Sequence, residues 1–230
     1  GIPVIEDAAH SFGATYKGRT VGTIADMTVF SLQAIKHITC ADGGILALKD
    51  PELYRRGKLL RWYGIDREGP RTDMRCELDI EEYGYKFNMN DVNATIGLAQ
   101  LPHTEEILTK HRENAEYYGS HLDLRFYSPA AWWEHYPYQS VSSSWLYTIL
   151  LPDQDQRLAF MRFMSDNGVM VSQVHSRNDT HTVFKESKAN LPGVSQFVER
   201  QVSIPVHWAL TKEQRGYIVD LCNEFAQQAV

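Results

Sequence analysis

The sequence predicts an α/β protein with two regions, and two observations support this prediction. Residues 1 to about 90 alternate short apolar runs with polar, turn-forming segments, as strands alternate with helices and loops in an α/β layer. Residues 123–230 show a second, smaller succession of strand and helix patterns, without an internal repeat or a low-complexity tract. We therefore expect a large-domain portion over residues 1–122, ending in a long helix, and a small α/β domain over residues 123–230.

Local signals place the helices of the first region. Asp50 and Pro51 form a cap and first-turn signature, so a helix is expected to start there. A long helix is expected after Asn90, where apolar residues follow helical spacing, and Pro102 should kink it or divide it in two. The charged stretch 66–79 is expected to be a mobile loop.

The second region has five clear elements. Its strands are rich in apolar and β-branched residues, and its first helix is amphipathic with Gly168 at its C-cap. The predicted order is strand, helix, strand, strand and helix, at residues 145–151, 156–167, 169–174, 202–206 and 211–226.

Composition excludes several classes of protein. Hydrophobic residues make up 43% of the chain, enough for a sizeable core, and charged residues 23%. The net charge of −6 argues against nonspecific nucleic-acid binding, which needs a basic face. No apolar run approaches the ~20 residues that cross a bilayer, and no secretory signal is visible. We expect a cytoplasmic protein that binds neither nucleic acid nor membrane.

Four polar residues are expected to meet at one edge of the predicted sheet. The apolar strand at residues 2–5 leads to Asp7 and His10, and a second apolar run ends at Ser31, five residues before Lys36. Ligands of open α/β sheets bind beyond the carboxyl ends of strands. A neutral lysine amine can form a Schiff base with a carbonyl, and partial burial favours the neutral state. A Lys with an Asp partner suits pyridoxal 5′-phosphate (PLP), whose aldehyde needs the amine and whose pyridinium needs the acid.

Several motifs in order resemble the DegT-type family of nucleotide-sugar aminotransferases, which are fold-type I PLP-dependent enzymes. The family pattern has an Asp, a Gln or His three residues later, then a Ser with a Lys five residues after it. The matching stretches of this chain, including an Arg-x-x-Gly segment, are residues 4–10, 18–22, 30–36, 39–44 and 59–64.

The resemblance implies a role for each of these residues. Asp7 would pair with the pyridine nitrogen, and Lys36 would carry the Schiff base to PLP. His10 would lie against the cofactor ring and its phenolic oxygen, and Ser31 would contact the phosphate. The implied fold is that of aspartate aminotransferase, with residues 1–122 as the C-terminal part of the PLP-binding large domain. Family members carry a substantial N-terminal segment before the Asp strand, so we expect this chain to lack that portion.

The implied reaction moves an amino group from an amino acid, expected to be glutamate, to a nucleotide-linked keto sugar. One alternative is a sugar dehydratase of the same family, in which His replaces the Schiff-base lysine. Here Lys36 holds that position and His37 follows it, which favours transamination. The sequence is also compatible with a regulatory protein that keeps the fold without chemistry, and with an inactive fragment. The nucleotide, the ketone position and the product stereochemistry are not specified by the sequence.

A second loop of the family usually reaches the cofactor phosphate of the partner subunit. Residues 84–91 match its Gly-x-Asn-x-Arg-Met pattern, but Lys86 stands at the Asn and Asn88 at the Arg. A lysine ammonium still suits a phosphate as a point charge. The resemblance therefore implies a homodimer with Lys86 as a cofactor-binding residue, and a solvated loop lysine is the equal alternative.

The segment after the strand at 169–174 contains His175, Arg177, Asp179 and His181. The matching family segment borders the substrate cleft, so His175 and Arg177 are candidates for binding a nucleotide phosphate or the carboxylate of the amino donor. The alternative is a polar loop with capping roles. We predict no metal site, because this spacing alone does not produce converging ligands.

Overall fold

We describe a computed structural model over residues 1–69, 79–129 and 139–229. It divides into two compact units. The first is Gly1–Glu105 together with the short strand β7 (Ser140–Val141), and the second contains the rest of the chain from Glu106. Among the helices of these described residues, none combines the length and the apolarity that crossing a membrane would require.

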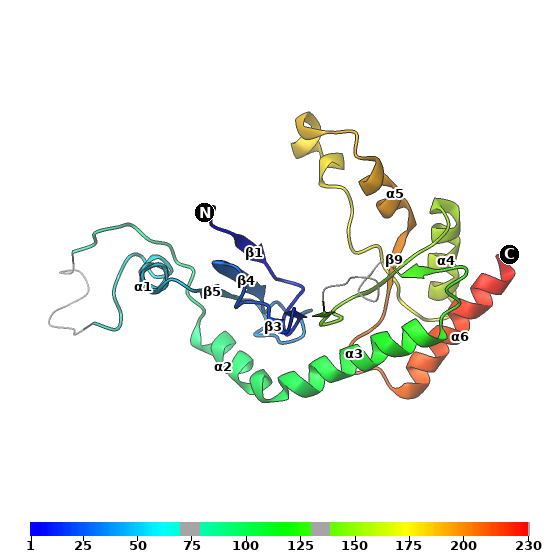
Figure 1. The fold of residues 1–230 in the computed structure, drawn as a ribbon, viewed down its shortest axis with the longest axis horizontal. Coiled ribbons are helices and arrows are strands. Elements are labelled where there is room, and N and C mark those ends of the chain that lie inside the picture. Colours follow the sequence, from blue (N-terminus) through cyan, green and yellow to red (C-terminus); the bar gives the residue numbers. More distant parts are fainter. Residues whose placement is uncertain (70–78, 130–138, 230) are drawn as a thin grey trace. The chain divides into compact units, whose positions relative to one another are not determined.

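The central element of the first unit is a sheet of three strands in the order β1-β4-β5 (Figure 1). β1 (Ile5–Asp7) lies parallel to β4 (Met27–Ser31), and β4 pairs antiparallel with β5 (Gly44–Leu48). A second sheet has the order β3-β2-β7, with β2 at Thr15–Tyr16 and β3 at Arg19–Thr20. β1 and β4, two neighbouring parallel strands that end at the same sheet edge, are the feature that positions the site.

The helix signals of the sequence are confirmed. α1 (Pro51–Leu60) begins after Asp50, whose side chain accepts hydrogen bonds from the amides of Glu52 and Leu53. α2 (Asp91–Gln100) is followed by a 3₁₀ turn at Leu101–His103 and then by α3 (Thr104–His121). Pro102 thus ends one helix and starts another, because it has no amide hydrogen to continue the ladder. The loop predicted at 66–79 lies mostly outside the described residues.

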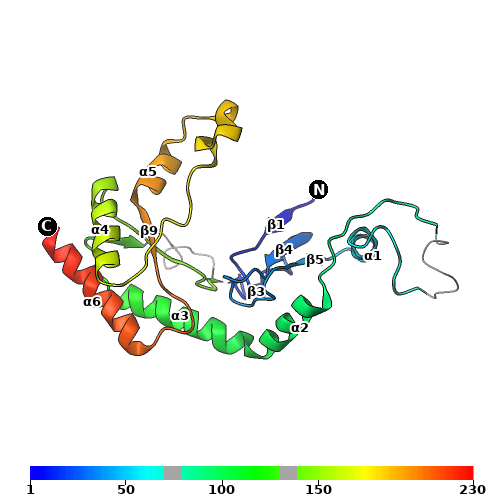
Figure 2. The same cartoon turned by 180° about the vertical axis from the view of Figure 1, so that it is seen from behind.

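The second unit is a three-stranded antiparallel sheet covered by helices, with strand order β6-β8-β9. The strands are β6 (Ser128–Pro129), β8 (Tyr147–Leu150) and β9 (Gln201–Ile204). The helices are α4 (Gln154–Asp166), α5 (Pro192–Arg200) and α6 (Lys212–Gln228), with 3₁₀ turns at Asn178–Thr180 and Thr182–Ser187. α4 contacts both α6 and β9, and Figure 2 shows the two helices beside each other from behind. Their facing side chains form a continuous buried core around Phe160 and Phe225.

Two details differ from the sequence-based expectation. The strand predicted at 169–174 is only an isolated bridge, in which Ser172 pairs with Ser203 through two backbone hydrogen bonds. The two units divide at Glu105/Glu106, whereas the predicted domain division lies after residue 122. The physical reason is that Ala115 and Tyr118 of α3 are buried in the core of the second unit, so most of this helix packs there.

Candidate active site

Asp7 and Ser31 lie at the same edge of the β1-β4-β5 sheet. The parallel register sets Asp7 opposite Val29, so Ser31 follows two residues beyond on the neighbouring strand. One Asp7 carboxylate oxygen accepts a 3.0 Å hydrogen bond from the Ala9 amide, and His10 lies exposed in the turn that follows. The structure therefore places both predicted strand-end residues as the sequence predicts.

A loop that folds back on itself positions the segment after Ser31. The Ser31 hydroxyl oxygen accepts a hydrogen bond from the Gln33 amide at 3.3 Å, while the Cys40 amide donates to the Leu32 carbonyl at 2.9 Å. The return strand needs glycine beside Ser31, because a Cβ at Gly44 would lie 2.8 Å from the Phe30 carbonyl oxygen. The Gly-Gly pair thus lets β5 lie close to the strand that carries the candidate phosphate ligand.

Lys36 lies in this loop and is half-buried. Its amide donates to the Gln33 carbonyl at 2.9 Å, which closes a tight turn between Ser31 and the lysine. Partial burial lowers the pKa of the Lys36 ammonium, while the negative charge of Asp7 acts in the opposite direction. Because burial is the larger effect, the net change is a lower pKa for an amine that lies close to a carboxylate.

His37 has a different environment from its neighbour. Its side chain is buried, as are those of Ile38 and Cys40. Lys36, and not His37, is therefore the residue of this pair that the loop presents at the sheet edge.

Lys86 lies in another part of the first unit. Its ammonium is 4.4 Å from the centre of the Trp62 ring, and it donates a 2.7 Å hydrogen bond to the Asn88 side chain. Its side chain is exposed, so it remains accessible. The phosphate contact with a partner subunit stays a prediction.

The structure gives Arg177 and His175 unequal positions in the second unit. The Arg177 guanidinium forms an ion pair with Asp179 and donates to the Ser195 hydroxyl at 2.6 Å and to the Ala189 carbonyl at 2.7 Å. These bonds connect the 3₁₀ turn at Asn178–Thr180 to α5, which is a structural role. His175 is exposed. Substrate binding by either residue stays a prediction.

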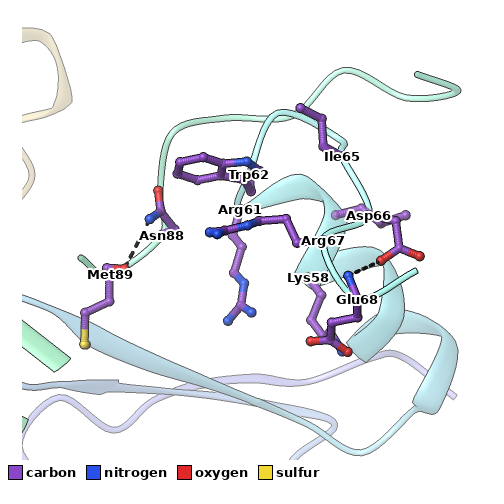
Figure 3. A pocket seen from close by; sticks show the side chains of 10 residues that line it. Lys58, Arg61, Trp62, Ile65, Asp66, Arg67, Glu68, Asn88 and Met89 are labelled. Carbon is purple, nitrogen blue, oxygen red and sulfur yellow. Dashed lines mark hydrogen bonds and ion pairs between the residues drawn. The ribbon is translucent and has the colours of Figure 1, made fainter. Parts of the chain in front are cut away.

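A pocket that the sequence did not predict lies beside α1. Its lining includes Trp62, Arg67 and Asn88, and Figure 3 shows the Arg67 side chain next to the Trp62 indole. The only sequence signal is the adjacent pair Trp62 and Tyr63 with an arginine at each end of 61–67, which helix and strand patterns do not interpret. No sequence pattern indicates that Lys86, far along the chain, reaches the same indole.

The fold is that of fold-type I PLP-dependent enzymes. The profile of the DegT/DnrJ/EryC1/StrS aminotransferase family matches residues 1–222, and the chain belongs to this family. Members of the family depend on PLP, and matching solved structures include a PLP-form and a PMP-form.

Individual relatives share both sequence and fold with the chain. AtS13 from Actinomadura melliaura is 39% identical with a TM-score of 0.87, over 96% of this chain and 57% of that one. The sugar aminotransferase CalS13 from Micromonospora echinospora is 35% identical with a TM-score of 0.87, over 96% and 58%. The uncharacterized protein MJ1066 of Methanocaldococcus jannaschii is 30% identical over 96% of this chain and 58% of its own length. The chain thus spans a little under three fifths of these relatives.

Proposed function

We propose that the protein is a PLP-dependent sugar aminotransferase, with glutamate as the expected amino donor and a nucleotide-linked keto sugar as the acceptor. The observation that carries this proposal is the half-buried Lys36, which lies near Asp7 and whose pKa is lowered by burial. Family membership and the likeness to a sugar aminotransferase support the same reaction class.

The residues at the sheet edge fit PLP. Bound PLP supplies an aldehyde that reacts with amines and a ring that withdraws electrons. The neutral amine of Lys36 would hold it covalently, and the Asp7 carboxylate would keep the ring nitrogen protonated through its negative charge. The Ser31 hydroxyl would bind the phosphate, and His10 would lie against the ring.

Lys36 has a second task once the amino donor has displaced it from the cofactor. Its freed amine would act as the base that takes the proton from the α-carbon of the donor. In the second half of the reaction the same amine would move a proton in the reverse direction. A lowered pKa makes the Lys36 amine easier to deprotonate, which suits a group that must both accept and release a proton.

The dehydratase alternative requires a histidine at the position of the lysine. The structure buries His37 and leaves Lys36 at the sheet edge, which favours transamination. A homodimer completed by Lys86 of a second copy is part of the proposal and rests on the family pattern alone.

Reduction of the PLP-treated chain with borohydride tests the assignment, because a Schiff base becomes a stable label that mass spectrometry maps. We expect the label on Lys36, its loss in Lys36→Ala, and its retention in Lys49→Ala, a lysine whose ammonium donates to the Ile24 carbonyl. In Lys36→Ala, the rate at which glutamate converts bound PLP should fall by at least ~10²–10⁴-fold, which is the contribution expected from proton transfer alone. Label spread over exposed lysines, or unchanged conversion in Lys36→Ala, would refute the role of Lys36.

A further inference from the structure

The loop that carries Lys36 leaves the sheet after β4 and returns to it at β5, and its two sides meet at Leu32. The Leu32 amide donates to the Gly43 carbonyl at 2.8 Å, and the Leu32 carbonyl accepts a hydrogen bond from the Cys40 amide at 2.9 Å. Residues 33–39, with Lys36 at their centre, therefore depend on the position of residues 40–43, which form the base of the loop.

The base of the loop contains a strained residue. Ala41 has a φ of +67°, in the left-handed region that residues other than glycine rarely adopt. Its amide donates to the Thr39 hydroxyl oxygen at 2.9 Å, and the Asp42 amide donates to the Cys40 carbonyl at 2.9 Å. A conformation of this kind persists only where the surrounding contacts fix it. Contacts from outside the loop should therefore help to hold its base.

Helix α2 supplies such contacts. The Asn93 side-chain amide donates to the Asp42 carbonyl at 2.8 Å, although the two residues are 51 positions apart in the sequence. One turn further along α2, a Cβ added at Gly97 would lie 3.4 Å from the Cβ of Cys40, which is van der Waals contact. Because residues four apart share one face of a helix, this face of α2 lies directly against the base of the loop.

The turn of α2 that carries Asn93 is itself fixed. Asn90 is the N-cap of the helix, and its side-chain oxygen accepts a 2.9 Å hydrogen bond from the Asn93 amide. Asn93 is half-buried, so its side chain is restricted as well. This one residue therefore joins the start of α2, through its backbone amide, to the base of the loop, through its side chain.

We propose that Asn93 is a positioning residue for Lys36, because its side-chain amide holds the base of the loop and the base holds the lysine amine in its half-buried place near Asp7. Asn93 acts through the two hydrogen bonds of Leu32. Without the Asn93 donor, the strained turn at Ala41 loses an outside contact, and the loop should open more often. An open loop exposes the amine to water and reduces the burial that lowers its pKa. The consequence for catalysis rests on the proposed function of Lys36.

Asn93→Leu tests the proposal, because leucine has a similar size, favours a helix and has no hydrogen-bond donor. We expect the pKa of Lys36 to rise toward the ordinary lysine value, so that reductive methylation of Lys36 by formaldehyde becomes slower near neutral pH. Mass spectrometry of the Lys36 peptide across the pH range measures this shift. Hydrogen exchange of the Cys40 amide, followed by nuclear magnetic resonance, should become faster by roughly 2- to 10-fold, the range for the loss of one hydrogen bond.

Three further variants separate the bond from a general effect on the helix. Asn93→Ala also removes the donor and should reproduce both changes. Asn93→Gln keeps an amide donor and should lie closer to the parent chain than Asn93→Leu does. Thr95→Ala is the matched control, because the Thr95 hydroxyl donates within α2, to the Asp91 carbonyl at 2.7 Å. It should leave both the Lys36 profile and the Cys40 exchange rate unchanged.

Two outcomes would overturn the proposal. One is an unchanged Lys36 profile with unchanged Cys40 exchange in the two variants that lack the donor. The other is an equal effect in Thr95→Ala, which would assign the change to a loosening of α2 as a whole. Borohydride labelling with PLP separates this proposal from the proposed function. Lys36 can be labelled while Asn93 proves unimportant, and the label can be absent while the Asn93 variants still change the reactivity of Lys36.

Discussion

The two units of the chain differ in how they bury apolar side chains. In the second unit, the buried hydrophobic cluster extends from Ala115 to Ala226 and includes residues of α3, α4, α6, β8 and β9. In the first unit, Ile5, Val29 and Ile45, one on each strand of the β1-β4-β5 sheet, remain exposed. The candidate chemistry nevertheless lies in the first unit. Local turns, glycine contacts and hydrogen bonds therefore position Lys36 more than a large core does.

The largest difference between the units should appear when a phenylalanine is truncated. Phe160 is fully buried, and its ring lies 5.3 Å from that of Phe225, whereas Phe87 in the first unit is 76% exposed. Phe160→Ala should lower the free energy of unfolding by about 3–5 kcal/mol, because it leaves a cavity. Phe87→Ala should change it by less than about 0.5 kcal/mol. Urea unfolding followed by circular dichroism measures both, and equal losses would contradict the contrast.

Backbone contacts in the first unit should be the next most sensitive feature. Gly44→Ala places a Cβ 2.8 Å from the Phe30 carbonyl oxygen, so β5 must shift away from β4. We expect a loss of about 1–3 kcal/mol in unfolding free energy, with reduced borohydride labelling of Lys36.

Gly193→Ala is the matched control for this change. Gly193 lies in α5 with no atom within 4 Å of an added Cβ, so the variant should be neutral or gain about 0.4–1 kcal/mol. If Gly44→Ala behaves like Gly193→Ala, the close strand pairing does not position the site.

The sequence predicted the local parts of this arrangement and missed the nonlocal ones. The cap at Asp50, the break at Pro102 and the strand ends at Asp7 and Ser31 depend on neighbours in sequence, and the structure has all of them. A full strand was expected around Ser172, and the structure has an isolated bridge there. The extent of this pairing depends on how much of β9 is available to it.

The pocket around Trp62 was missed for the same reason. Arg67 reaches the indole locally, but Lys86 reaches it only because Gly64 and Gly84 let two distant segments cross. Motif spacing describes only the order of residues along the chain, so it does not predict such a crossing.

The reactivity of Lys36 should depend on pH in a way that identifies its neighbour. Burial lowers the pKa of Lys36. Half of its amine should therefore be neutral at a pH below about 10.4, the ordinary pKa of lysine. Asp7 acts in the opposite direction, because its charge stabilises the ammonium. Asp7→Asn should therefore lower this pKa further and speed reductive methylation of Lys36 by formaldehyde near neutral pH.

Glu6→Gln provides the control for this titration. Glu6 is the adjacent carboxylate on β1, and its side chain accepts a hydrogen bond from the Thr28 hydroxyl. Mass spectrometry of the Lys36 peptide across the pH range gives the profile for each variant. An unchanged profile in Asp7→Asn, or an equal shift in Glu6→Gln, would show that Asp7 is not the charge that Lys36 senses.

The smallest effect should come from Ile5→Thr, compared with the same substitution in a strand of the second unit. Ile5 on β1 is 67% exposed and Ile149 on β8 is fully buried. Threonine keeps the β-branched shape in both, so strand propensity changes little and burial decides the outcome. Ile149→Thr should cost about 2–4 kcal/mol, since it loses apolar contacts and buries a hydroxyl. Ile5→Thr should stay within about 0.5 kcal/mol and leave Lys36 labelling unchanged. A large loss in Ile5→Thr would mean that β1 buries this side chain in solution, and the site would then depend on apolar packing after all.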